Sequence, residues 1–202
     1  RNINYMDQFW FYFTLGFNHV LDINGLDHFY FLIALSLPLS FKEIRKLVWW
    51  ITLFTIGHTF SLFQFYKNID KQSESWIEFL IPITIILTCF SVFFKNHKSN
   101  KRKSLFFLLS FFTFFFGLIH GLGFGRYFSK IVLDINQYQP LLEFALGIEF
   151  AQLIIVFFVL LVNHLVLNFL KLPKKIWLYS ITLIIMFNSF NMAISNFPLL
   201  VN

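Results

Sequence analysis

The stretch Asn18–His28, "NHVLDINGLDH", contains four side chains of the kinds that bind transition-metal ions. They are His19, Asp22, Asp27 and His28. Neutral imidazole combined with carboxylate suits divalent ions such as nickel, cobalt and zinc, whereas copper(I) prefers thiolate and thioether ligands, which this stretch does not contain. The stretch therefore predicts a site for nickel, cobalt or zinc.

Later parts of the sequence add ligand-type side chains inside apolar segments. His58 lies within "TIGHTFS", His120 lies within "FGLIHGLGFG", and Glu149 precedes Gln152 by three residues, which puts both on one helix face. An ionisable side chain inside a membrane is costly and therefore marks a functional candidate. We expect seven metal ligands: His19, Asp22, Asp27, His28, His58, His120 and Glu149. The residues expected to hydrogen-bond to these ligands and fix their orientation are Gln152, Glu78, Glu143, Thr55 and Thr59.

Each of these features also has a purely structural explanation. His58 could hydrogen-bond between helices. Glu78 and Glu143 could be wetted carboxylates stabilised by the positive end of a helix dipole. The "GxxxG" spacing of Gly117 and Gly121 could serve close helix packing alone. The metal hypothesis therefore depends on whether the ligands converge in space.

The composition determines which elements must position these residues. Of the 202 residues, 57% are hydrophobic and 32 are Phe, which excludes an ordinary soluble domain because so much apolar surface could not be buried in water. Apolar runs near the length of about twenty residues needed for a transmembrane helix recur along the chain. The sequence therefore predicts an all-α integral membrane protein, with one transmembrane domain over residues 1–202.

Seven hydrophobic segments are expected to form the transmembrane helices of a single bundle, and the first two are short for a full crossing. The expected segments are Tyr5–Leu21, Leu26–Phe41, Leu47–Tyr66, Trp76–Phe94, Ser104–Phe124, Pro140–Leu170 and Ile176–Phe197. In this arrangement the candidate ligands lie in the outer half of the membrane.

The basic residues predict the orientation of the bundle. Twelve of the sixteen Lys and Arg residues fall on one side of a seven-crossing arrangement, many of them in "KNHKSNKRK" at 95–103. The positive-inside rule makes that side cytoplasmic, with the N-terminus inside and the C-terminus outside. The net charge of +6 is explained by topology, so no nucleic-acid partner is expected. His97 and His164 fall on the basic side and are expected to be incidental.

Five motifs, in this order, carry a resemblance to a known family: "HVLDINGLDHFYFLIAL", "LFTIGHTFSL", "EFLIPITI", "FFGLIHGLGF" and "LLEFALGIEFAQ". They resemble the HupE/UreJ family of small membrane proteins over nearly the whole chain. The family is associated with uptake of nickel, and sometimes cobalt, for hydrogenase, urease or cobalamin enzymes. The resemblance implies a permease of the bacterial cytoplasmic membrane. The family's signature falls on His19, Gly25, Asp27 and His28, and its later motifs match His58, His120 and Glu149.

Three functions are compatible with these observations. The first is a secondary transporter that takes up a divalent metal ion, with pH coupling because ligands must lose protons to bind metal. The second is an intramembrane zinc-dependent hydrolase with Glu149 as the general base. The third is a non-transporting scaffold or accessory protein. We favour the transporter, which is not an enzyme and has no catalytic residue, and whose partners are the metal ion and the lipid bilayer. A partner membrane subunit, a metalloenzyme maturation pathway and the oligomeric state stay open.

Overall fold

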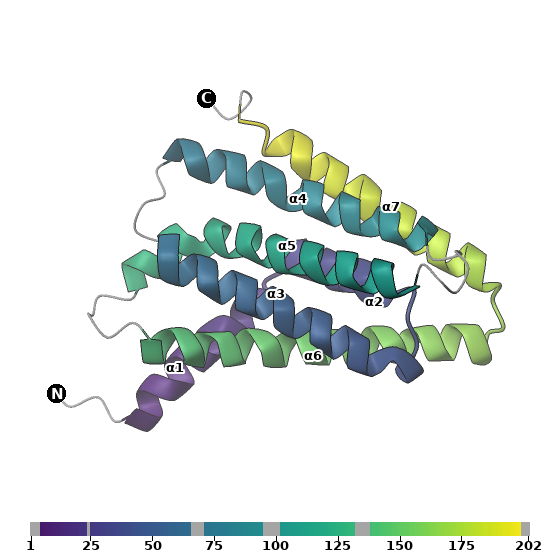
Figure 1. The fold of residues 1–202 in the computed structure, drawn as a ribbon, viewed down its shortest axis with the longest axis horizontal. Helices are drawn as coiled ribbons and strands as arrows, with labels where there is room; N and C mark the ends of the chain where they lie inside the picture. The colour runs from purple at the N-terminus through teal and green to yellow at the C-terminus, as the bar shows by residue number, and fades with distance from the viewer. Residues whose placement is uncertain (1–4, 24, 66–70, 95–101, 132–137, 199–202) are drawn as a thin grey trace.

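The computed structural model describes residues 5–23, 25–65, 71–94, 102–131 and 138–198 (Figure 1). These residues form seven α-helices and a short 3₁₀ helix, and no strand occurs among them. The elements are α1 (Tyr5–Leu21), α2 (Asp27–Ser36), η1 (Phe41–Glu43), α3 (Ile44–Phe65), α4 (Lys71–Phe94), α5 (Arg102–Ile131), α6 (Tyr138–Asn168) and α7 (Lys174–Ser195). The prediction of an all-α bundle with a short second helix is confirmed.

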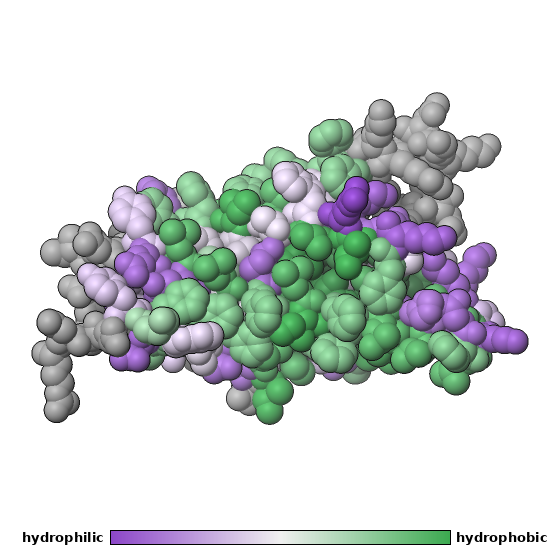
Figure 2. Space-filling view, turned by 90° about the horizontal axis from the view of Figure 1, so that it is seen from below, coloured by the Kyte–Doolittle hydropathy of each residue, from purple (hydrophilic) through white to green (hydrophobic). Residues whose placement is uncertain are grey.

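The surface of the bundle is that of a membrane protein. Four of the described helices are long and apolar enough to cross a membrane, in the segments Ser73–Val92, Phe106–Gly125, Tyr138–Asn168 and Lys174–Ser195. Figure 2 shows hydrophobic side chains over most of the middle of one face and hydrophilic ones gathered toward the ends. Many large aromatic side chains point outward, among them Phe111 at 58% exposure. Such a surface is favourable in lipid and unfavourable in water.

Glycines allow two pairs of helices to approach closely. At the contact between α3 and α5, a Cβ added to Gly117 would overlap the carbonyl oxygen of Phe54, and one added to Gly121 would overlap that of His58. At the contact between α1 and α6, a Cβ added to Gly16 would overlap the carbonyl oxygen of Phe144. Small residues are the usual means of close helix contact in membranes. The "GxxxG" spacing therefore does serve helix packing.

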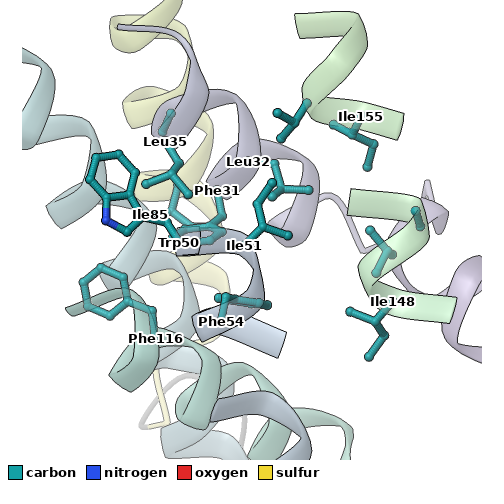
Figure 3. Close-up of a cluster of buried hydrophobic side chains, with 14 of the residues drawn as sticks. Phe31, Leu32, Leu35, Trp50, Ile51, Phe54, Ile85, Phe116, Ile148 and Ile155 are labelled. Carbon is teal, nitrogen blue, oxygen red and sulfur yellow. The ribbon is translucent and has the colours of Figure 1, made fainter. Parts of the chain in front are cut away.

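The helix α2 lies at the centre of the bundle. Its residues Phe31, Leu32 and Ala34 are fully buried. Figure 3 shows how its apolar side chains meet those of the surrounding helices; the labelled residues are Phe31, Leu32, Leu35, Trp50, Ile51, Phe54, Ile85, Phe116, Ile148 and Ile155. A helix that is apolar on every side is stable only in such a position. The first turn of α2 carries Asp27 and His28, so this packing also holds the predicted ligands inside the protein.

The helices α1 and α2 follow one another in one direction through the bundle. Figure 1 shows α1 beginning at the end of the bundle where α7 ends, and α1 ends partway along. The helix α2 continues from there antiparallel to α5, because His28 lies beside His120 and Phe31 lies beside Phe116. Near the far end, the Leu37 carbonyl accepts a hydrogen bond from Asn163 Nδ2 at 3.0 Å.

This arrangement differs from the predicted seven crossings, which would leave the two ends of the chain on opposite sides of the membrane. In the structure, the start of α1 and the end of α7 lie at the same end of the bundle (Figure 1). Hydropathy shows that a segment is apolar but does not give its direction. The helix α2 has 10 residues, which is about 15 Å of helix and roughly half of the hydrocarbon thickness. It is therefore too short to cross a membrane by itself.

Candidate metal centre

Three histidines from three different helices meet inside the bundle. His19 lies near the end of α1, His28 lies in the first turn of α2, and His58 lies on α3. Each offers a ring nitrogen, and these three nitrogens lie within 4.8 Å of one another. His120 of α5 adjoins the group, with its ring centroid 5.3 Å from that of His28. We call these four residues the histidine cluster.

The histidine cluster is buried and most of its nitrogens lack partners. His28 is 2% exposed, His58 is 0% exposed and His120 is 2% exposed. Within the described part of the chain, no hydrogen bond reaches Nε2 of His19, His28 or His120, or either ring nitrogen of His58. Buried polar atoms nearly always have a partner, and each exception requires an explanation. Five such nitrogens in one place, from four residues that commonly bind metals, indicate a site for a positively charged ligand.

The partners of the other ring nitrogens fix two tautomers. Asp27 Oδ1 accepts a hydrogen bond from the His28 backbone N–H at 2.8 Å and lies 3.1 Å from His28 Nδ1. The Phe116 carbonyl lies 2.7 Å from His120 Nδ1. A carboxylate and a carbonyl can only accept, so in both neutral imidazoles Nδ1 donates its proton. The lone pairs are then on Nε2, the atoms that lack partners, as in histidines that bind metals.

Local sequence explains how these groups are placed. Gly25 closes a turn by donating its backbone N–H to the Asp22 carbonyl at 3.1 Å, and α2 begins two residues later. Asp27 is therefore in the first turn, where the helix dipole favours a negative charge. On the opposite side, Gly121 follows His120 and packs against the backbone of His58. The close contact of α3 and α5 at Gly121 thus brings the imidazoles of His58 and His120 toward each other.

Aromatic rings enclose the histidine cluster. Phe54 lies against His28 and His120, with ring centroids 5.8 Å and 5.0 Å away. Phe124 covers His19 at 4.0 Å and stacks on Phe144 at 5.2 Å. These walls keep water from the lone pairs, so interactions between the site and a bound ion are stronger than they would be in water.

An open pocket connects the histidine cluster with the outside of the bundle. It has a volume of about 670 Å³, and its wall includes Asn18, His19, Asp22 and Asp27. Asp22 is exposed in this wall and is not part of the histidine cluster. His19 lies in the pocket wall and also in the cluster, so it joins the exposed carboxylate to the buried imidazoles.

Comparison with known proteins shows the family of the chain. The family model described as HupE / UreJ protein matches residues 2–196. The chain belongs to the HupE/UreJ family. No curated protein and no solved structure matches it significantly. The HupE/UreJ proteins are membrane metal permeases related to nickel and cobalt transport, so the resemblance found in the motifs is confirmed and the chain is an integral membrane protein.

In this HupE/UreJ protein the structure separates one predicted ligand, Glu149, from the histidine cluster. Glu149 Oε1 accepts a hydrogen bond from Thr52 Oγ1 at 2.7 Å, and Glu149 Oε2 contacts Thr55 Oγ1. Gln152 Oε1 lies 3.0 Å from Thr55 Oγ1. Of the residues expected to orient the ligands, Thr55 therefore contacts Glu149 and Gln152 contacts Thr55, and neither hydrogen-bonds to a histidine of the cluster. Thr52 was missed, although its position three residues before Thr55 could have placed it on the same helix face.

The remaining predicted residues of the HupE/UreJ chain lie in three places. Glu143 is buried on α6, with Oε1 accepting from Gln139 Nε2 at 2.8 Å. Thr59 Oγ1 is buried on α3 and has no hydrogen-bond partner among the described residues. Glu78 is exposed on α4, and its carbonyl accepts from Asn196 Nδ2 at 3.2 Å. Hydropathy indicates how deep a residue lies in the membrane, but it does not show which way its side of the helix faces. The sequence therefore could not show which of these residues face the histidine cluster.

Of the two histidines expected to be incidental, His164 is exposed near the end of α6 and pairs with Asn168, while His97 lies outside the described residues.

Proposed function

We propose that the chain is a secondary permease for a divalent transition-metal ion, nickel or cobalt, and that the ion binds in the histidine cluster. The observation that carries the proposal is the convergence of His19, His28 and His58 with buried, unpartnered ring nitrogens. Imidazole nitrogens beside one carboxylate form the donor set that suits nickel, cobalt and zinc. Asp27 also supplies negative charge near an ion that would otherwise be costly to place inside a membrane.

The pocket supports movement of the ion through the site. Exposure falls from Asp22 in the pocket wall to His19 and then to the buried His28 and His58. An ion that enters the pocket loses water in steps and gains one imidazole at a time. The ligands bind only when deprotonated, so protons compete with the ion at each step.

The charges at the two ends of the bundle support uptake rather than export. Lys42 lies in η1, and Arg45 and Lys46 lie in the first turn of α3. Lys171 lies between α6 and α7, and Lys174 begins α7. All of these residues are at the end of the bundle opposite the start of α1 (Figure 1). The positive-inside rule makes this end cytoplasmic. The pocket then belongs to the outer half of the membrane, and the start of α1 and the end of α7 lie outside.

The environment of Glu149 favours the permease over the intramembrane hydrolase. A general base needs a free oxygen within hydrogen-bonding reach of a metal-bound water. In the structure both carboxylate oxygens of Glu149 contact threonine hydroxyls. We therefore assign the histidine cluster to binding and passage of the ion.

Proteoliposomes test the proposed function. Vesicles that contain the purified protein and a trapped metal indicator should accumulate nickel or cobalt with saturable kinetics, and vesicles with the His28→Ala variant should match empty vesicles. Folded wild-type protein that binds none of nickel, cobalt and zinc would overturn the proposal. Binding without accumulation would favour an accessory protein that only holds the ion.

The Asp27→Asn substitution separates the charge of this carboxylate from its shape. Asparagine can still accept the backbone N–H of His28, but it lacks the negative charge that strengthens the imidazole as a donor. We expect nickel affinity, measured by calorimetric titration, to fall by about 10- to 100-fold. The exposed Asp7 at the start of α1 provides the control, since Asp7→Asn should leave the affinity unchanged. Equal affinities for both variants would show that Asp27 does not act on the site.

A further inference from the structure

A second polar group lies where α3 contacts α6, and it contains a carboxylate, two hydroxyls and one side-chain amide. It consists of Thr52, Thr55, Glu149 and Gln152, with the Ile51 carbonyl 3.2 Å from Thr55 Oγ1. We call it the oxygen cluster. Thr55 precedes His58 by three residues on one helix, so the oxygen cluster lies about one turn from the histidine cluster, toward the basic end of the bundle.

The carboxylate of the oxygen cluster has no cationic partner among the residues that the structure describes. Glu149 lies well inside Tyr138–Asn168, a segment long and apolar enough to span a membrane. Among the described residues, no lysine, arginine or histidine forms an ion pair with Glu149, in contrast to Glu43, which pairs with Lys46 at 3.5 Å. Neutral threonine hydroxyls are its contacts. An ionised carboxylate at this depth without a cationic partner is unfavourable, so the oxygen cluster is a place where a bound cation would be stabilised.

The hydrogen bonds of the oxygen cluster leave one buried polar atom over, and turning over one amide makes that atom an oxygen that can bind a cation. Thr55 has one hydroxyl proton, yet its Oγ1 contacts the Ile51 carbonyl, Glu149 Oε2 and Gln152 Oε1. Gln152 is 0% exposed, and its Nε2 has no partner in the described residues. If the amide is turned over, Nε2 can donate to Thr55 and the amide oxygen becomes the unpartnered buried atom. In both orientations of the amide, one buried polar atom of Gln152 has no hydrogen-bond partner among the described residues.

The oxygen atoms of the oxygen cluster indicate which kind of cation it would bind. Carboxylate, hydroxyl and carbonyl oxygens suit hard cations, whereas nickel and cobalt bind well to imidazole. With Glu149 ionised, a monovalent cation gives a neutral complex in the oxygen cluster, whereas a divalent ion would leave a net charge inside the membrane. We infer that Thr52, Thr55, Glu149 and Gln152 form a sodium site.

Sodium in this site would act on the histidine cluster through α3. An ion held between Thr55 on α3 and Glu149 on α6 fixes the two helices against each other, and His58 lies one turn away on α3. Sodium should therefore increase the affinity for the transported metal, and the metal should increase the affinity for sodium by the same factor. This coupling rests on the proposed permease function, whereas the sodium site itself does not.

Thermal unfolding of the purified protein without transition metal tests the sodium site. We expect 100 mM sodium chloride to raise Tm by about 3 °C relative to potassium or choline chloride at the same concentration. The increase should disappear in Thr55→Val, which replaces the hydroxyl by a methyl group, and in Glu149→Gln. The control is Thr113→Val, because Thr113 is equally buried on α5 but bonds only its own helix. Equal Tm values in the three salts, or a sodium effect that persists in Thr55→Val, would overturn the inference.

Nickel titrations in sodium and in choline chloride test the coupling. We expect about tenfold tighter nickel binding in sodium for the wild type and no difference for Thr55→Val. If nickel does not bind but sodium still raises Tm, the proposed permease function fails and the sodium site stands. If nickel binds equally in both salts and Tm does not respond to sodium, the sodium site fails and the permease function stands. His28→Ala should keep the sodium effect on Tm, which separates the two clusters.

Discussion

The His58→Leu variant loses nickel binding by more than about 100-fold and at the same time becomes more stable without metal. His58 is fully buried, and neither of its ring nitrogens has a hydrogen-bond partner in the described residues. Leucine has a similar size and removes the unsatisfied polar atoms of the imidazole, and a buried polar group without partners costs about 1–3 kcal/mol. We expect the metal-free variant to gain about 1–3 kcal/mol of unfolding free energy.

These opposite changes distinguish a ligand from a structural histidine. A histidine that holds helices together loses favourable contacts when it is replaced, so its variant unfolds more easily. Calorimetric titration gives the nickel affinity, and thermal or detergent-induced unfolding gives the stability. The control is His164→Leu, because His164 is exposed near the end of α6 and should change neither quantity much. A destabilised His58→Leu variant that still binds nickel would contradict the assignment of this histidine.

The second large effect is expected from adding a single methyl group to Gly121. A Cβ at this position would overlap the His58 carbonyl oxygen and Ser61 Oγ and would lie 2.9 Å from the His58 carbonyl carbon. Two of these three atoms belong to the backbone of α3, so α3 and α5 must move apart. We expect Gly121→Ala to cost about 1–3 kcal/mol of stability, as overpacking does in well-packed interiors. Nickel affinity should fall as well, because His58 and His120 lie on the two helices that separate.

A glycine two residues away on the same helix provides a matched control. A Cβ at Gly123 would lie 2.9 Å from Cδ1 of Ile81, which is the end of a flexible side chain. Gly123→Ala should therefore be neutral or stabilise α5 by up to about 1 kcal/mol, because alanine favours helix more than glycine does. Unfolding temperatures and nickel affinities of the two variants would be compared directly. Equal effects would show that the close contact of α3 and α5 does not position the metal site.

The sequence by itself determined the class and the family of the protein, and it predicted the chemistry of the site. Apolar runs of membrane length specify helices because a backbone in lipid must satisfy its own hydrogen bonds. Asp27 and His28 are neighbours in the chain, so their interaction is local and could be expected. The ligand types in "NHVLDINGLDH" indicated a borderline metal ion before any contact was known.

Only the tertiary structure decided which residues meet. Glu149 and His58 are both ionisable residues in apolar segments, yet His58 joins the histidine cluster while Glu149 contacts threonines at another level of the bundle. The difference depends on which face each helix turns toward its neighbours. It also depends on where along the helices the glycines permit a close approach. The structure also decided that α1 and α2 run in the same direction, because hydropathy measures how apolar a segment is and contains no information about its direction.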